Sequence, residues 1–159
     1  MKTILILEDE PSLMNLLHRV LNRYGYATLQ ARDAEEALRR FADNGRQIDL
    51  LLADVILPKV SGIHVALLLR TELSDLGVIL MSGYPSSEWS GRYAADLRRL
   101  GSDTVGTLQK PFTPQCLLKT IVDLVGVAPT EALRTGSRAT SGAPFASRGR
   151  SGPELRESA

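Results

Sequence analysis

The sequence has little cysteine, almost no net charge and no long apolar run, and each absence excludes a class of protein. The single cysteine, Cys116, cannot form a disulfide within the chain, which fits a reducing compartment such as the cytoplasm. The net charge of +1 argues against a dedicated nucleic-acid-binding protein, because such proteins usually carry a basic excess on one face. No window approaches the roughly 18 apolar residues of a membrane helix. We therefore expect a cytoplasmic protein without a membrane segment.

The N-terminal apolar run is too short to be the core of a signal peptide. It extends only from Ile4 to Leu7, and Glu8 and Asp9 follow directly. We interpret this run as the first β-strand.

Length and composition predict one domain followed by a tail. The 159 residues suffice for one ordinary domain and are too few for two. Beyond residue 126, small and polar residues dominate, and such a segment cannot bury enough apolar surface to offset its chain entropy. We expect a domain over residues 1–126 and a flexible, disordered tail over 127–159. The tail shows no helix-turn-helix pattern, so direct DNA binding is not expected.

Short apolar runs alternate with segments of helical spacing, which predicts an α/β fold with five strands and five helices. The run from Ile48 to Ala53 is almost continuously apolar, as expected for a strand covered on both faces of a parallel sheet. The predicted strands are Thr3–Leu7, Ala27–Ala31, Ile48–Ala53, Val78–Met81 and Thr104–Leu108.

The first helix is predicted from an i, i+3, i+4, i+7 stripe of apolar residues, with Met14 assigned to the opposite, polar face. That stripe consists of Leu13, Leu16, Leu17, Val20, Leu21 and Tyr24. Asp33 followed by Glu36 resembles a capping box and predicts the start of the second helix. A third helix is expected over residues 62–73 and a fourth within 87–100. The fifth begins at Thr113, with a proline at its first helical position.

Polar residues follow the predicted strands at the point where each strand ends. Glu8 and Asp9 follow the first strand, Asp54 the third, Ser82 the fourth and Lys110 the fifth. Parallel sheets place their ligands beyond the carboxyl ends of the strands, so these side chains should converge on one crevice. Carboxylates suit a hard cation such as Mg²⁺, and a hydroxyl and an ammonium suit a phosphoryl group.

Four motifs together resemble the receiver domain of two-component response regulators, over roughly residues 2–125. Each motif alone is a weak signal, but the four occur in the family's order and with family-like spacing. The motifs are Leu7-Glu8-Asp9-Glu10-Pro11, Asp54-Val55-Ile56-Leu57-Pro58 with Gly62, Met81-Ser82-Gly83-Tyr84, and Lys110-Pro111-Phe112. The resemblance implies a doubly wound, flavodoxin-like sheet of five parallel strands in the order 2-1-3-4-5.

The resemblance also implies a role for each residue in a magnesium site. Asp54 would be the phosphoacceptor and a metal ligand. Asp9 would bind Mg²⁺ directly, Glu8 through water, and the backbone carbonyl of Ile56 would be a further ligand.

By the same resemblance, Ser82 would bind a phosphoryl oxygen and reorient on phosphorylation, and Lys110 would pair with the acyl phosphate. The Lys110–Pro111 bond is a candidate cis peptide. The implied function is transfer of a phosphoryl group from the phosphohistidine of a sensor histidine kinase or histidine phosphotransfer protein to Asp54. The domain would be a slowly self-dephosphorylating switch rather than an enzyme. The residues of its motifs are most similar to those of receivers in hybrid sensor kinases.

The sequence departs from the family pattern in the region expected to transmit the signal. Many receivers have an aromatic residue three positions before the lysine, where this chain has Thr107. The stretch from Ser82 to Lys110 is also longer than is typical. A degenerate receiver that binds partners without phosphate therefore stays an alternative.

Other interpretations of the same residues also stay open. A Mg²⁺-dependent phosphohydrolase would need a second acid at the position of Ile56, which counts against that class. Asp9 and Glu10 could serve only the first helix dipole. His18 and His64 lack ligand spacing, so we expect them on the solvated surface. Trp89 is either a packing residue or part of a partner surface.

Overall fold

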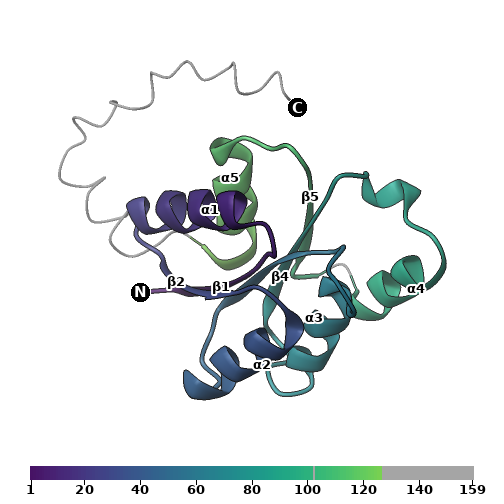
Figure 1. Ribbon diagram of the computed structural model, residues 1–159, viewed down its shortest axis with the longest axis horizontal. Coiled ribbons are helices and arrows are strands. Elements are labelled where there is room, and N and C mark those ends of the chain that lie inside the picture. The colour runs from purple at the N-terminus through teal and green to yellow at the C-terminus, as the bar shows by residue number, and fades with distance from the viewer. Residues whose placement is uncertain (102, 127–159) are drawn as a thin grey trace.

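The computed structural model describes residues 1–101 and 103–126, in which five strands alternate with five α-helices (Figure 1). The tail expected over 127–159 lies outside the described residues. A short 3₁₀ helix, Ser86–Glu88, precedes the fourth α-helix. The elements are β1 (Thr3–Leu7), α1 (Pro11–Arg23), β2 (Ala27–Ala31), α2 (Ala34–Asp43), β3 (Leu50–Asp54), α3 (Gly62–Arg70), β4 (Gly77–Ser82), α4 (Gly91–Leu100), β5 (Val105–Gln109) and α5 (Pro114–Val125).

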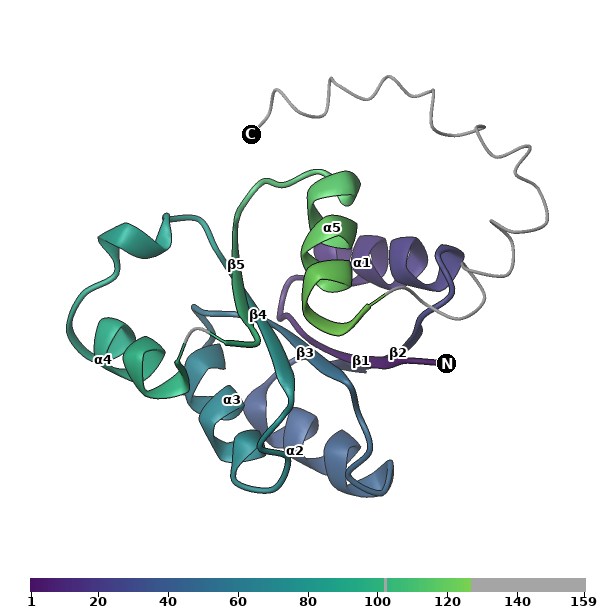
Figure 2. The ribbon, with the colours of Figure 1, turned by 180° about the vertical axis from the view of Figure 1, so that it is seen from behind.

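The five strands form one parallel sheet in the order β2-β1-β3-β4-β5, which confirms the predicted fold class. Helices α1 and α5 cover one face, and α2, α3 and α4 cover the other (Figures 1 and 2). The direction of winding reverses between β1 and β3. The residues after these two strands therefore flank the position where such sheets bind ligands.

The central strand β3 is buried at every position, which explains its continuous apolar run. Leu50 and Leu52 pack into the core under α1 and α5, whereas Leu51 and Ala53 pack into the core under α2 and α3. Burial of one leucine side chain contributes about 1.5–3 kcal/mol, so this strand anchors both layers. Asp54 is the last residue of that rigid strand.

The predicted buried face of α1 is wrong at two positions. Met14, assigned to the polar face, is 4% exposed, whereas Leu16, assigned to the apolar face, is 46% exposed. The buried residues Met14, Leu17 and Leu21 are spaced i, i+3 and i+7 and fix the true centre of the face. Leu16 lies beyond the edge of that face. Because leucines also lie at the edges of this face, the apolar residues of the sequence did not show where its centre is.

The helix starts agree with the sequence more closely than the helix ends. Asp33 caps α2 by accepting a hydrogen bond from the Glu36 amide, and Thr113 caps α5, which has Pro114 in its first turn. Helix α3 ends at Arg70, three residues before the predicted Leu73. The Arg70 guanidinium donates to the backbone carbonyls of Leu76, of Leu100 at the end of α4 and of Thr104, and to the Thr104 hydroxyl, so it ties the residue before β5 to the end of α3. No helix among the described residues is long and apolar enough to cross a membrane.

Candidate functional site

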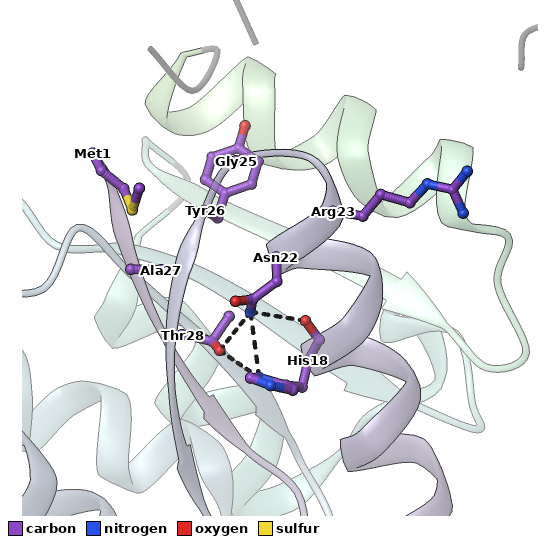
Figure 3. Close-up of a pocket in the computed structure, with 8 residues that line it drawn as sticks. All are labelled: Met1, His18, Asn22, Arg23, Gly25, Tyr26, Ala27 and Thr28. Carbon is purple, nitrogen blue, oxygen red and sulfur yellow. Dashed lines mark hydrogen bonds between the residues drawn. The ribbon is translucent and has the colours of Figure 1, made fainter. Parts of the chain in front are cut away.

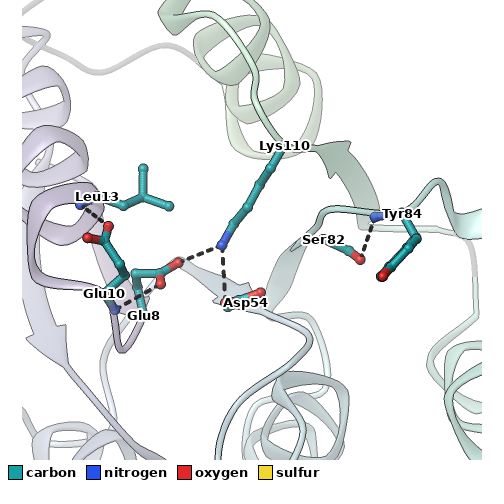
Figure 4. A network of polar contacts seen from close by, with 7 residues as sticks. All are labelled: Glu8, Glu10, Leu13, Asp54, Ser82, Tyr84 and Lys110. Carbon is teal, nitrogen blue, oxygen red and sulfur yellow. Dashed lines mark hydrogen bonds and ion pairs between the residues drawn. The ribbon is translucent and has the colours of Figure 1, made fainter.

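Three of the predicted site residues meet at the carboxyl edge of the sheet. The Lys110 Nζ atom lies 3.2 Å from Glu8 Oε1 and 3.1 Å from Asp54 Oδ2 (Figure 4). The Glu8 side chain is 1% exposed, that of Asp54 9% and that of Lys110 26%. The ammonium therefore bridges two buried carboxylates that come from neighbouring strands.

Asp9 completes an acidic cluster with Glu8 and Asp54. One carboxylate oxygen from each residue lies within 4.8 Å of the others. Glu8 and Asp54 are buried, and Asp9 is exposed on the solvent side. Three carboxylates face one ammonium, so the cluster has an excess of negative charge and offers only oxygen ligands. This donor set fits a small, hard divalent cation such as Mg²⁺.

Electrostatics favour a cation in this cluster. Burial raises the pKa of the Glu8 carboxyl, and the charge of Asp54 adds to that rise. Burial also raises the pKa of Asp54, although Lys110 favours its ionised form. Burial alone would lower the pKa of Lys110, but the charges of Asp54 and Glu8 outweigh it and raise that pKa. Lys110 therefore stays cationic at neutral pH, and the ionised carboxylates still lack full compensation.

We expect the free energy of unfolding, measured in EDTA, to fall as the pH rises above 4.5. Glu8 and Asp54 have raised pKa values in the folded chain, so their contribution is present below their ordinary values of 4.5 and 3.8 and is lost as pH rises through the raised values. Magnesium at 100 times its Kd should add about 2.7 kcal/mol. Urea unfolding at stepped pH measures both effects. A free energy that rises with pH in EDTA, or an equal fall in Asp54→Asn, would contradict this account.

Ser82 is buried at the end of β4, and its hydroxyl points away from the ammonium-bridged pair (Figure 4). Its Oγ accepts a hydrogen bond from the Tyr84 amide at 3.1 Å. Its carbonyl accepts one from the Lys110 amide at 2.7 Å. Ser82 thus lies beside the site because its backbone carbonyl binds the Lys110 amide, while its hydroxyl binds the amide of the following turn.

The remaining predictions at the site meet mixed outcomes. The Ile56 backbone amide favours the ionised form of Asp54 and so opposes the rise of its pKa by burial, while the Ile56 carbonyl as a metal ligand stays a prediction. The Lys110–Pro111 peptide is cis, as the motif indicates. Glu10 caps α1 by accepting from the Leu13 amide, and its own amide donates to Glu8 Oε2. The sequence predicted a role for Glu10 at the start of the helix, but it did not predict the hydrogen bond from the Glu10 amide to Glu8.

The lengthened segment after Ser82 surrounds a hollow of about 220 Å³ beside Thr107. Tyr84, 64% exposed, and Trp89 line it from the loop. The Trp89 indole nitrogen donates to the Tyr84 carbonyl at 3.2 Å, and the ring packs against the core under α3 and α4. Trp89 therefore packs against the core from this loop, and its part in a partner surface stays a prediction.

His18 differs from its prediction as a solvated residue. It is half-buried, and its Nδ1 atom lies 2.7 Å from the Thr28 hydroxyl on β2 (Figure 3). The Asn22 side-chain amide donates to the same hydroxyl and to the His18 carbonyl. This network lines a surface hollow of about 500 Å³ and ties α1 to the edge strand. His64 is exposed, as expected.

The strand order and the acidic cluster with a lysine at the carboxyl edge of the sheet define a flavodoxin-like domain with a candidate cation site. Residues 4–122 match the family model of the response regulator receiver domain. The chain belongs to the response regulator receiver domain family of two-component signalling, as its four motifs predict.

Three relatives illustrate this similarity. The transcriptional regulatory protein PhoP of Bacillus subtilis (strain 168), named for alkaline phosphatase synthesis, is 35% identical over 114 residues, which are 72% of this chain and 44% of that protein. Sensor kinase CckA of Brucella abortus (strain 2308) is 28% identical over 123 residues, 77% of this chain and 12% of that protein. The chain thus spans less than half the length of either protein. The crystal structure of response regulator TrrA from Thermotoga maritima, in complex with Mg(2+)-BeF, has a TM-score of 0.61 and 31% identity, covering 78% of this chain and 99% of that one.

Proposed function

We propose that this domain is a Mg²⁺-dependent phosphoacceptor whose Asp54 receives a phosphoryl group from a phosphohistidine. The donor would be a sensor histidine kinase or a histidine phosphotransfer protein in the cytoplasm. One observation carries the proposal: the Asp54 carboxylate ends a rigid buried strand, with an ammonium at 3.1 Å and two further carboxylates close enough to share a cation.

In this proposal Asp54 is the nucleophile. One of its carboxylate oxygens attacks the phosphorus in line, the phosphorus–nitrogen bond of the donor breaks, and the electron pair leaves with the imidazole. Glu8, Asp9, Asp54 and the Ile56 carbonyl would hold Mg²⁺, which would offset charge on the transferring oxygens. Lys110 would then pair with the acyl phosphate, since its ammonium lies 3.1 Å from the Asp54 carboxylate. Water then hydrolyses the acyl phosphate slowly, which resets the domain.

Ser82 would couple the phosphoryl group to the rest of the domain. Its hydroxyl would leave the Tyr84 amide to donate to a phosphoryl oxygen, which frees the turn after β4 to move. Phosphorylation would thereby favour a second conformation of the segment from β4 to α5 over the conformation in the structure. Thr107 cannot follow Ser82 as an aromatic ring would, so the readout must use other groups of this segment.

A phosphate-independent interaction module is the second candidate. Only Thr107 and the lengthened segment favour it, because both lie on the face expected to carry the signal. The intact charge cluster favours phosphorylation, since three converging carboxylates around a lysine would have no purpose in a domain that never binds a cation or phosphate.

The expected result on incubation with MgCl₂ and acetyl phosphate is a gain of one phosphoryl group by the wild-type chain and no gain by Asp54→Asn. The asparagine keeps the shape of the side chain but removes the nucleophilic oxygen. Intact mass spectrometry measures the gain directly. Asp123→Asn, an exposed acid of α5, is the matched control and should be phosphorylated like wild type. An unmodified wild-type chain, or equal uptake by Asp54→Asn, would refute the phosphoacceptor assignment.

A further inference from the structure

A second hollow, separate from the acidic cluster, lies between the loop before α3 and the start of α4. Its volume is about 350 Å³. Small-molecule sites typically occupy about 300–1,000 Å³. None of the proposed phosphorylation residues lines it, and its walls come from two elements on the same face of the sheet (Figure 1). The lining residues are Lys59, Val60, Ser61, His64, Arg92 and Tyr93.

Three of these lining side chains are basic, and none of the six is acidic. Lys59, His64 and Arg92 are all exposed at the rim. In the described part of the chain, no acidic side chain forms an ion pair with any of the three. The nearby acid of α4, Asp96, is turned to the buried side of the helix and pairs with Arg99. Positive charge is thus concentrated around a concave surface without a compensating carboxylate.

Hydrogen-bond donors complete this basic hollow. The Ser61 hydroxyl oxygen accepts from the His64 amide at 3.1 Å, which leaves its proton for another acceptor. Tyr93 adds a second hydroxyl. At the start of α4, Ser90 makes no side-chain capping bond and the first turn has no acid, so the amides next to Arg92 keep their preference for negative charge.

We infer that this hollow binds the phosphate group of a small soluble phosphate ester. A phosphate dianion matches two permanent cations, a histidine and two hydroxyl donors better than a single carboxylate does. One water occupies about 30 Å³ of liquid, so the hollow has room for more than a bare phosphate ion. The additional volume beside the Tyr93 ring would hold the organic part of the ester. This site is independent of the proposed phosphorylation of Asp54.

The test is a titration of the full chain followed by ¹H–¹⁵N correlation spectra at constant ionic strength. EDTA is present so that no divalent cation draws phosphate to the acidic cluster. The probes are AMP, inorganic phosphate, and adenosine without phosphate. AMP should shift the amides of Ser61, His64, Arg92 and Tyr93, and it should bind more tightly than inorganic phosphate. Adenosine should shift none of them.

The double variant Lys59→Asn/Arg92→Gln should weaken AMP binding by about tenfold or more, because it removes two charge-assisted contacts. Asparagine is chosen because Lys59 has a φ of 72°, which asparagine tolerates. The matched control is Arg39→Gln/Arg98→Gln, which removes the same charge from exposed positions on α2 and α4 outside the hollow. It should bind AMP like wild type.

Three results would overturn the inference. Equal AMP affinity in the double variant and wild type would exclude the hollow as the site. An equal loss in the control would show that only net charge matters. Equal affinity for inorganic phosphate and AMP would exclude an ester as the ligand. Transfer of a phosphoryl group from acetyl phosphate to Asp54 is measured in a separate experiment. The failure of one proposal can therefore be distinguished from the failure of the other.

Discussion

Replacing Lys110 by methionine should lower the free energy of unfolding by about 3–5 kcal/mol in EDTA at pH 7, the loss expected when one partner of a buried ion pair is removed. Among the described residues, the Lys110 ammonium is the only cation that forms an ion pair with Glu8 or Asp54. Methionine retains most of the side-chain volume, so the loss reflects charge rather than a cavity. Urea unfolding followed by the fluorescence of Trp89, the single tryptophan, measures it.

The matched control is Lys119→Met on α5. Lys119 forms an ion pair with Asp123 at 3.0 Å, a distance close to those between Lys110 and its two carboxylates. The side chains of Lys119 and Asp123 are both exposed. An exposed pair contributes about 0–1 kcal/mol, so this variant should remain near wild type. Adding Glu8→Gln to Lys110→Met should recover part of the loss, because it removes one of the uncompensated charges. Equal losses in Lys110→Met and Lys119→Met would contradict the account.

The convergence of Glu8, Asp9, Asp54 and Lys110 could be predicted from the sequence. Each follows an apolar run, and the carboxyl ends of parallel strands meet at one edge, so the ends of the runs predict that these side chains share that edge. The run before Asp54 is particularly clear because it is buried on both faces. Strand order required the family resemblance, because the apolar runs themselves do not state which strands are neighbours.

The orientation of side chains within the site could not be predicted in the same way. The Ser82 hydroxyl accepts from Tyr84 because of the local turn, and the turn conformation depends on packing of the loop through Trp89. The basic hollow joins Lys59 to Arg92, which are far apart in the sequence. Only the packing of α4 beside α3 brings them together, and neither residue stands out in the sequence alone.

The reversal of Met14 and Leu16 on α1 has a related cause. Both faces of the stripe carry leucines, so apolar identity alone does not locate its centre. The docked helix turns about its axis until Met14, Leu17 and Leu21 meet the core, and Leu16 is left exposed. Periodicity thus predicts that a helix is amphipathic more reliably than it predicts the direction of its buried face.

Gly62→Ala should destabilise the domain strongly, by about 3 kcal/mol or more, at the upper end of the range for overpacking. A Cβ at this position would overlap the backbone carbonyl oxygen of Asp54 and would approach Ala53 Cβ to 3.0 Å. The obstacle is the backbone of a buried central strand, which cannot move aside as a flexible side chain could. The motif glycine therefore allows the start of α3 to pack directly on the strand that ends in Asp54.

The same substitution should also weaken phosphorylation, because relief of the overlap must shift either α3 or the Asp54 backbone. The Gly62 amide donates to the Val55 carbonyl at 3.1 Å, so a shift of α3 also displaces the loop that carries Ile56. Urea unfolding and intact mass after acetyl phosphate treatment measure the two effects. Gly83→Ala is the control, because a Cβ there meets nothing within 4 Å, and its stability should change by about 0.5 kcal/mol or less. If Gly62→Ala were as stable as Gly83→Ala, α3 could not be packed against Asp54 as closely as the structure shows.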